Sequence, residues 1–417
     1  MKVVRYEKGD LGSLEMLLGR AEALSKKVRE AERIVDYVKK EGIQAVVELT
    51  EKFDGVRICE LEVGEEEIEE AYKKCSKKDL GAIRVAKRRI ERFQKLQKAG
   101  IADTTLATGE GLSELKWLPI RRVGVYAPAG KAPLVSSVLM GVVPAKVAGA
   151  QEVVLCTPPQ KDGLANPFIL VAAREAGADR ILKIGGAQAI AAMGYGLECL
   201  EPVQLVVGPG NAYVTAAKQI LAARGVVKID MPAGPSEVVV IADENANERV
   251  VASSMLAQAE HGEDSRSVCI TTSEKFAGRL SARLGKFSDR MIVVLVSSME
   301  EALEISNEYA PEHLEIFSEN WREVLEGVIN AGAVFINTGT VYGDYGITGC
   351  NHILPTGGSA KSYSGLSIMT FMRGIFIQKL REKARKKFAR IAARLARIEG
   401  LEEHARAAEI GGEYGDV

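Results

Sequence analysis

The four histidines of this chain are the residues that most plainly indicate chemistry. They are few for 417 residues, and each lies among polar or acidic neighbours: His261, His313, His352 and His404. Imidazole is the main metal ligand and acid–base group near neutral pH. The residues around each histidine therefore show where a reactive site is expected.

The string QAEHG places Gln258 and His261 three residues apart at the end of a predicted helix over residues 245–260, with Gly262 as its C-cap. Side chains at this spacing share one face of a helix. An imidazole nitrogen and an amide oxygen suit zinc or a similar ion. A metal site and a hydrogen-bonded surface pair are both compatible with this string.

The string APEHLEIF places Glu312 and His313 directly after Pro311, where a helix is expected to begin. An adjacent acid and imidazole can supply two proton-transfer groups to one substrate. The alternative is the first turn of a helix, where the macrodipole favours an acidic residue. This string alone leaves both interpretations open.

Two further strings carry an acid and a histidine. GDYGITGCNHILPTGG holds Asp344 and His352 in a glycine-rich loop, where functional groups are often found. Asp344 is a candidate metal ligand and His352 a candidate orienting group; the alternatives are a turn aspartate and a hydrogen-bonded loop histidine. IEGLEEH holds Glu399 and His404, which are either charged helix-end residues or groups that reach another subunit's site.

Three glycine-rich strings follow predicted strands: GGAQA (185–189), VGPGNAYV (207–214) and MPAGPSEVVV (231–240). Such loops can present backbone N–H groups to phosphate. None of them fits GxGxxG, because Tyr213 stands where the third glycine after Gly208 and Gly210 would lie. A standard dinucleotide fingerprint is therefore absent.

The elements that position these strings have an α/β pattern. Apolar spacing predicts helix over 13–53 up to a turn at 53–55, helix over 66–99, and then a hairpin or loop. From 121 onward, short apolar strands alternate with helices of about ten residues, which indicates parallel sheets. We expect two Rossmann-like parallel-sheet domains with helical N-terminal and C-terminal extensions. The predicted boundaries are 1–20 for an N-terminal extension, 21–122 plus 238–365, 123–237, and 366–417 for a dimerisation tail.

The tail is predicted to be helical from 375, with one apolar stripe and one basic face. The basic face is more often a solvated surface than a nucleic-acid arm. The apolar stripe needs a cover, for which a partner subunit is the economical candidate. Its members are Leu380, Ala384, Phe388, Ile391, Leu395 and Ile398.

Composition excludes several other classes of protein. Apolar residues make up 47%, charged residues 27%, and the net charge is -1, as in ordinary soluble globular proteins without a nucleic-acid-binding domain. The N-terminal residues lack an apolar signal core, and no run of uncharged residues is long enough for a membrane span. Six scattered cysteines without a CxxC pair fit reduced thiols. A cytoplasmic location is expected.

Taken together, these strings resemble the histidinol dehydrogenase family from FDGV at 53 to His404. The resemblance includes VGVYAPAGKAPLVSSVLM, PAKVAGA, GGAQAIAAMGYG, VGPGNAYV, IDMPAGPSEVVVIAD, QAEHG, YAPEHLEI, GDY, NHILPT, GLS and EGLEEH. Two features depart from the family pattern. Ala129 stands where the family usually has the first glycine of PGG, and the loop between Asp344 and His352 is one residue longer.

The resemblance implies a zinc-dependent enzyme that oxidises L-histidinol to L-histidine through histidinal with two NAD, in the last steps of histidine biosynthesis. It assigns the base to His313 and water activation to Glu312. The implied zinc ligands are Gln258, His261, Asp344 and, from the other subunit of a homodimer, His404. The implied substrate contacts are Ser236, His352 and Glu399, together with His313 and the zinc ligands. The implied NAD contacts are Tyr126, Gln188 and Asn211.

Chemistry agrees with this assignment. Histidinol carries an imidazole and an amine, both good zinc ligands, so a zinc ion would act as a template. Two oxidations at one carbon require both a base and a group that activates water. A zinc hydrolase using Glu312 as base, and a non-catalytic NAD- or metal-binding regulator, are the alternatives; adjacent Glu312 and His313 argue against the regulator.

Overall fold

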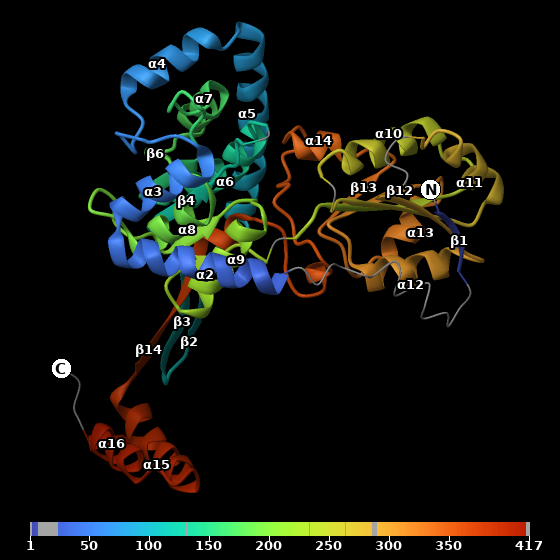
Figure 1. Ribbon diagram of the computed structural model, residues 1–417. Coiled ribbons are helices and arrows are strands. Elements are labelled where there is room, and N and C mark those ends of the chain that lie inside the picture. The colour runs from blue at the N-terminus through green and yellow to red at the C-terminus, as the bar shows by residue number, and fades with distance from the viewer. Residues whose placement is uncertain are drawn as a thin grey trace. The chain divides into compact units, whose positions relative to one another are not determined.

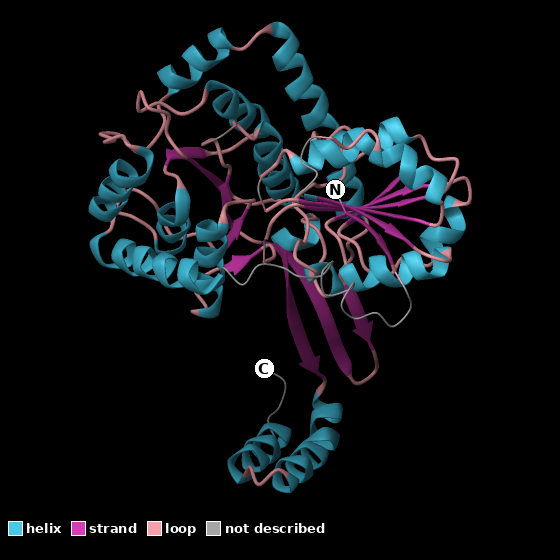
Figure 2. Ribbon diagram, turned by 45° about the vertical axis from the view of Figure 1, so that its right-hand side comes forward, coloured by secondary structure: helices cyan, strands magenta, loops and turns pink. Residues whose placement is uncertain are grey.

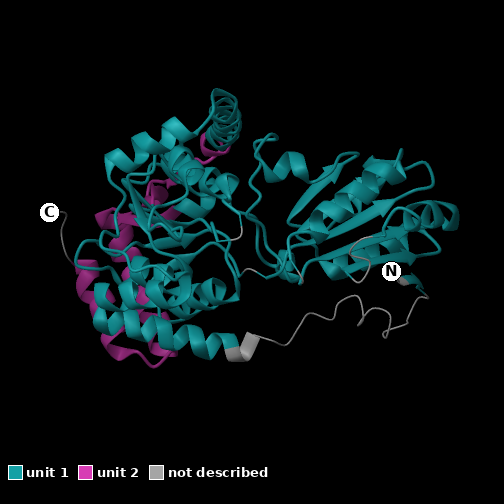
Figure 3. Ribbon diagram, turned by 45° about the horizontal axis from the view of Figure 1, so that its top comes forward, with its two compact units in different colours: residues 1–96, 120–371 teal, residues 97–119, 372–417 magenta. Residues whose placement is uncertain are grey.

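The computed structural model describes residues 2–6, 24–130, 132–232, 234–262, 264–285 and 290–413. The chain divides into two compact units (Figure 3). Unit 1 contains residues 1–96 and 120–371, and unit 2 contains residues 97–119 and 372–417. Part of the helix predicted over 13–53 and most of the predicted N-terminal extension lie outside the described residues.

One sheet of unit 1 has five parallel strands in the order β6-β5-β4-β7-β8. The order reverses between β4 and β7, so their carboxyl ends flank the place where doubly wound sheets bind ligands. Its strands are β4 (Arg122–Tyr126), β5 (Glu152–Thr157), β6 (Arg180–Lys183), β7 (Leu205–Val207) and β8 (Lys228–Ile229).

Helices cover both faces of this sheet. Val125 and Tyr126 point to opposite faces because side chains alternate along a strand. A Cβ atom on Gly141 would come within 2.5 Å of Val125, so α6 packs directly on one face. Tyr126 belongs to the core under the other helices. Helices α6 (Val135–Ala148) and α7 (Pro167–Ala176) lie on the first face, and α2 (Leu24–Glu41), α3 (Ile43–Asp54), α8 (Gly186–Tyr195) and α9 (Ala212–Ala223) on the second.

Each long helix predicted near the N-terminus is two helices. Gly42, at φ 57°, separates α2 from α3, and Cys75 ends α4 (Glu65–Lys74) before α5 (Lys77–Ala99). Helices α2 and α3 bury apolar residues against the five-stranded sheet, and α4 packs on α7.

The second sheet of unit 1 has six parallel strands in the order β1-β11-β10-β9-β12-β13. Figure 1 shows α10 and α11 on one face of this sheet and α12 and α13 on the other. Neighbouring residues of β9 pack on opposite faces, Val238 with α10 and α11 and Val239 with α12 and α13. The prediction of two Rossmann-like parallel sheets is confirmed. The elements are β1 (Lys2–Arg5), β9 (Glu237–Ala242), α10 (Glu248–Ala259), β10 (Arg266–Thr271), α11 (Glu274–Ser281), β11 (Met291–Leu295), α12 (Met299–Tyr309), β12 (His313–Phe317), α13 (Trp321–Glu326) and β13 (Ala333–Ile336).

The remaining elements of unit 1 are short and follow the six-stranded sheet. They are α14 (Val341–Asp344) and the 3-10 turns Ser359–Lys361 and Ile368–Phe371. None of the helices in the described part of the chain is long and apolar enough to cross a bilayer.

Unit 2 combines an antiparallel sheet of order β14-β3-β2 with a helical hairpin (Figure 2). Arg397 of the first helix forms ion pairs with Glu402 and Glu409 of the second. The helix predicted from 375 is wrong for residues 375–380, because these residues pair with β3 along their whole length. The elements are β2 (Thr104–Ala107), β3 (Gly111–Pro119), β14 (Met372–Leu380), α15 (Glu382–Ile398) and α16 (Glu402–Glu413).

Two predictions around the histidine strings are also wrong. No helix begins after Pro311; residues 313–317 form β12, whose five side chains are all buried between β9 and β13. Burial on both faces favours a central strand over a surface helix. Helix α10 ends at Ala259 with Glu260 as a right-handed C-cap, so Gly262 does not cap it.

Candidate functional site

The amino ends of two neighbouring strands bring the first candidate residues together. Glu312 directly precedes β12, and Glu237 begins β9. The parallel register places His313 beside Val238. The side chains of Glu312 and His313 are therefore held by main chain at the edge of a rigid sheet.

A single residue, Glu237, binds both side chains through its backbone. Its N–H donates to Glu312 Oε2 at 3.1 Å, and its carbonyl oxygen lies 3.3 Å from His313 Nδ1. A carbonyl only accepts, so Nδ1 of His313 carries the proton and Nε2 carries a lone pair. Within the described residues Nε2 has no hydrogen-bond partner, although it is buried. This nitrogen is thus prepared to accept a proton.

Burial sets the electrostatics of the pair. Burial lowers the pKa of His313 to about 3, although its hydrogen bond to the Glu237 carbonyl acts in the opposite direction. The imidazole is therefore neutral near pH 7. Burial also raises the pKa of Glu312 well above its usual value, which makes its carboxylate a stronger base. Their side chains lie close together, with His313 Nδ1 3.7 Å from Glu312 Oε2.

Asp344 and His352 lie beside this pair. Asp344 Oδ1 is 3.7 Å from His313 Nε2. His352 Nδ1 lies 2.5 Å from the Asp344 carbonyl oxygen, and its Nε2 is 3.4 Å from Ser137 Oγ. Burial raises the pKa of Asp344 to about 6, while His261 lowers it. Burial lowers the pKa of His352 to about 4. The extra residue of the loop does not prevent His352 from reaching Asp344.

Gln258 and His261 lie at the end of α10. His261 is exposed, and its Nδ1 is 3.0 Å from the Ala257 carbonyl oxygen. This bond fixes the proton on Nδ1 and leaves Nε2 to bind a ligand, as second-shell partners do for metal-bound histidines. Gln258 is buried, and its Nε2 atom has no partner in the described part of the chain. A buried amide N–H of this kind favours a bound group that accepts a hydrogen bond.

The three histidines of unit 1 share one arrangement. In His261, His313 and His352, Nδ1 is bound to a main-chain carbonyl. Each ring is thereby fixed in one tautomer; Nε2 of His352 lies 3.4 Å from Ser137 Oγ, whereas Nε2 of His313 has no partner among the described residues. No group of three or more His, Cys, Asp or Glu able to hold a metal exists among the described residues. Among the implied zinc ligands, only His261 and Asp344 are both of these residue types and in unit 1. Gln258 is an amide, and His404 belongs to unit 2.

Glu315 is a buried carboxylate that sequence reasoning missed. It lies on β12, accepts a hydrogen bond from Ser254 on α10, and accepts one from Thr340 N–H at 2.8 Å. Ser254 is one turn before Gln258, and Thr340 directly precedes α14, which ends at Asp344. Glu315 therefore connects the two segments that carry Gln258 and Asp344.

Glu315 should make stability depend on pH. Burial raises its pKa from 4.5 to about 7. The folded protein then binds this proton more tightly than the unfolded chain, so the free energy of unfolding falls as pH rises from about 4.5 through about 7. The loss is roughly 3 kcal/mol at most, from about 1.4 kcal/mol per pKa unit.

The isosteric Glu315→Gln variant should remove this part of the pH dependence. Its amide oxygen still accepts from Ser254 and Thr340. Denaturant unfolding of wild type and variant at about pH 5 and pH 8 measures the change. Glu319→Gln, an exposed change two residues after the end of the same strand, serves as the control. Parallel pH profiles for wild type and Glu315→Gln would contradict the prediction.

The carboxyl edge of the five-stranded sheet brings another set together. Tyr126 ends β4, and its hydroxyl accepts from Gly186 N–H at 3.1 Å at the start of α8. Gln188, in the first turn of α8, is buried, and its Nε2 has no partner in the described segments. Asn211 lies at the N-terminus of α9 and accepts from the N–H groups of its first turn. These three residues flank the place where the strand order reverses.

Three predicted residues lie elsewhere. Ser236 directly precedes Glu237, and its carbonyl oxygen accepts from Arg266 N–H at 3.2 Å. Glu399 caps the end of α15, and His404 lies on α16; both are exposed residues of unit 2. Unit 1 therefore contains every predicted site residue except these last two, in one set at each of its two sheets.

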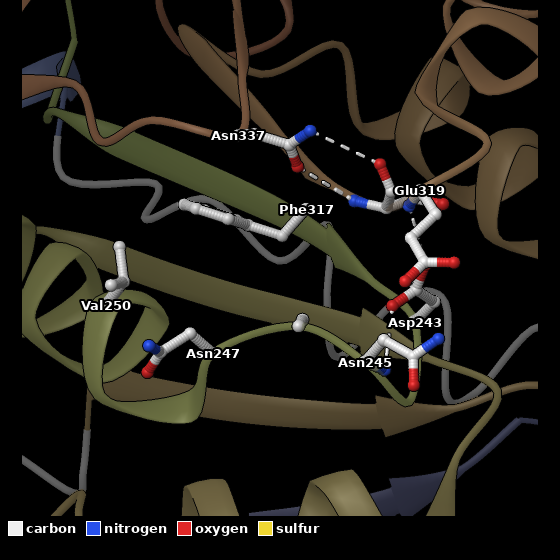
Figure 4. A pocket seen from close by; sticks show the side chains of 9 residues that line it. Asp243, Asn245, Asn247, Val250, Phe317, Glu319 and Asn337 are labelled. Atoms are coloured by element: carbon white, nitrogen blue, oxygen red, sulfur yellow. Dashed lines mark hydrogen bonds between the residues drawn. The ribbon is translucent and has the colours of Figure 1, made fainter.

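A cavity of about 260 Å³ lies at the opposite ends of β9 and β12 from Glu237 and His313. Its polar groups are largely bound within the protein (Figure 4). Asp243 accepts from the N–H groups of Asn245 and Glu319, and Asn337 is hydrogen-bonded to the Ser318 backbone. None of the predicted site residues lines this cavity, so the site is assigned to the amino edge.

Comparison with known proteins decides the family. A family model described as histidinol dehydrogenase matches residues 19–411. A histidinol dehydrogenase from Bacteroides thetaiotaomicron is 46% identical over 393 residues, which cover 90% of this chain and 91% of that protein. The chain belongs to the histidinol dehydrogenase family.

Other members of the histidinol dehydrogenase family match over almost their whole length. One from Methanopyrus kandleri is 42% identical and covers 94% of this chain and 96% of its own. A crystal structure of histidinol dehydrogenase from Elizabethkingia anophelis is 36% identical, has a TM-score of 0.90, and covers 99% of this chain and 98% of that chain. The predicted family and its oxidoreductase class are confirmed.

Proposed function

We propose that this protein oxidises L-histidinol to L-histidine through histidinal, using two NAD, in the last steps of histidine biosynthesis. The observation that carries the proposal is the backbone of one residue, Glu237, which holds a neutral imidazole beside a basic carboxylate. Removing a hydride from an alcohol requires loss of the hydroxyl proton. Oxidising the resulting aldehyde to an acid requires addition of water.

His313 fits the role of base in both oxidations. Its Nε2 accepts the hydroxyl proton while the C–H bond breaks and the hydride leaves. NAD, when bound, supplies the hydride acceptor. Glu312 takes a proton from water as the water oxygen adds to the aldehyde carbon. Protonated His313 returns its proton to the aldehyde oxygen, which completes the diol and leaves His313 neutral again. His313 then accepts a proton from that diol as the second hydride leaves, and the carboxylic acid remains.

Gln258, His261 and Asp344 would hold zinc, with His404 of the other subunit as fourth ligand. The fit rests on the lone pair that His261 leaves on Nε2 and on the amide oxygen that Gln258 carries at the same helix end. All four ligands are nitrogen or oxygen donors suited to zinc. Zinc, when bound, supplies a fixed point for the imidazole and amine of histidinol, which orients the carbinol carbon. Ser236, His352 and Glu399 complete the proposed substrate contacts.

Tyr126, Gln188 and Asn211 are the proposed NAD contacts. They lie at the carboxyl edge of a doubly wound sheet, where nucleotides bind beside helix N-termini. The unsatisfied Nε2 of Gln188 supports a ligand at the start of α8. Ala129 follows β4 and does not alter the Tyr126 contact with Gly186.

Turnover should require the metal. Chelator-treated protein is expected to form no NADH from histidinol, because the substrate loses its fixed point, and added zinc should restore formation. NADH absorbance measures both results, with magnesium as the control cation, since it prefers oxygen ligands. Full activity in a preparation shown to be metal-free would remove zinc from the proposal.

A further inference from the structure

Asp54 is a carboxylate that the residues described so far do not use. It is the last residue of α3, where the negative end of the helix dipole disfavours an anion. Its Oδ2 atom is buried and has no hydrogen-bond partner in the described ranges. Burial accordingly raises the pKa of Asp54 to about 6. A buried polar atom without a partner calls for an explanation, and fold stability does not supply one.

The position of Asp54 supplies an explanation. A Cβ atom built on Gly185 would lie 2.8 Å from Pro158 Cβ and 3.4 Å from Asp54 Oδ2. Pro158 is the first residue after β5, and Gly185 is the N-cap of α8. The Asp54 carboxylate also adds to the rise that burial gives the pKa of Tyr126. Asp54 therefore lies at the carboxyl edge where Tyr126 and Gln188 are found.

Doubly wound folds usually carry an acidic residue just after their second strand, and the carboxyl edge of the five-stranded sheet lacks one there. In those folds, an Asp or Glu accepts a hydrogen bond from the adenosine ribose 2′-hydroxyl of NAD. Here β5 is followed by two prolines, and the first acid, Asp162, accepts from Leu164 N–H. Asp54, the last residue of α3, places a carboxylate with an unpaired oxygen near the end of β5.

We propose that Asp54 selects NAD over NADP by accepting a hydrogen bond from the adenosine ribose 2′-hydroxyl. The inference rests on the proposed function and names the residue that sets its cofactor class. In NADP this hydroxyl carries a phosphate, which has no proton to donate there and repels a carboxylate. A second unsatisfied group, Nε2 of Gln188, lies at the same helix start.

The test compares dinucleotide binding by wild type, Asp54→Asn and Glu51→Gln, measured by isothermal titration calorimetry. Asp54→Asn should weaken NAD binding by about tenfold, because a charge-assisted hydrogen bond is lost. Its affinity for NADP should stay the same or rise. Glu51→Gln removes one exposed charge from the same helix and should leave the affinity ratio unchanged.

Thermal unfolding of the ligand-free protein separates this role from a structural one. Asp54→Asn should raise the melting temperature, because it removes an unsatisfied buried charge. An NAD-to-NADP affinity ratio within about twofold of wild type would overturn the inference. If that result came from protein that still oxidises histidinol with NAD, the proposed function would stand. If the wild-type protein bound neither NAD nor NADP, both the proposed function and the role of Asp54 would be wrong.

Discussion

Glu312→Gln is expected to slow the oxidation of histidinal by about 100- to 10,000-fold while leaving the oxidation of histidinol to histidinal much less affected. The amide cannot take a proton from water, and only the second oxidation needs water to add. The amide oxygen of glutamine can still accept from Glu237 N–H, so the strand edge keeps its geometry. The variant therefore tests chemistry rather than folding.

The two oxidations are measured separately by supplying histidinol or histidinal and following single-turnover formation of NADH. His313→Asn is the matched comparison, because loss of the base should slow both oxidations. Circular dichroism of both variants checks that the fold is intact. Equal and small losses in the two steps of Glu312→Gln would show that Glu312 only supports the start of β12.

The candidate site shows which information a sequence carries. Side chains with distinctive chemistry, such as Glu312 and His313, are visible as strings, and family resemblance assigns roles to them. Both are held by the backbone N–H and carbonyl of Glu237, and backbone groups have no signature in the residue pattern. Glu315 and Asp54 were missed for a related reason. Their importance lies in burial and in unsatisfied oxygens, which depend on segments far apart in the sequence.

The fold was predictable where the apolar residues of the sequence are also the residues buried in the structure. The parallel strands are short, buried apolar runs, and both sheets follow from them. The predicted helix after Pro311 failed because a proline that could start a helix is only a local signal, whereas His313 and Glu315 are buried between neighbouring strands. Residues 375–380 likewise form a strand because β3 is available for pairing, which the local sequence cannot show.

Unit 2 has an exposed apolar face that a partner subunit could cover. Three apolar side chains of α15 are more than half exposed: Ile391 (51%), Leu395 (56%) and Ile398 (69%). An exposed apolar face on a helical hairpin usually marks an interface. We propose that this face pairs with a second copy of the chain and that the same unit delivers His404 and Glu399 to the partner's site.

If the site is shared, two inactive variants should restore each other. His404→Asn and His261→Asn should each be nearly inactive as pure dimers, because loss of a metal ligand removes much of the affinity. When the variants are mixed, unfolded and refolded, random pairing makes about half of the dimers hybrid. Each hybrid then holds one site with both substitutions and one site with neither.

Activity should therefore recover to roughly a quarter of the refolded wild-type value. Native mass spectrometry of variants with different tags measures the hybrid fraction, and refolded wild type corrects for losses. A mixture of His404→Asn with Asp344→Asn should recover equally, because Asp344 and His261 belong to the same half of the site. A mixture of His261→Asn with Asp344→Asn should stay inactive, since no site in that hybrid is intact. Hybrids of His404→Asn and His261→Asn that form but remain inactive would place His404 in the site of its own chain.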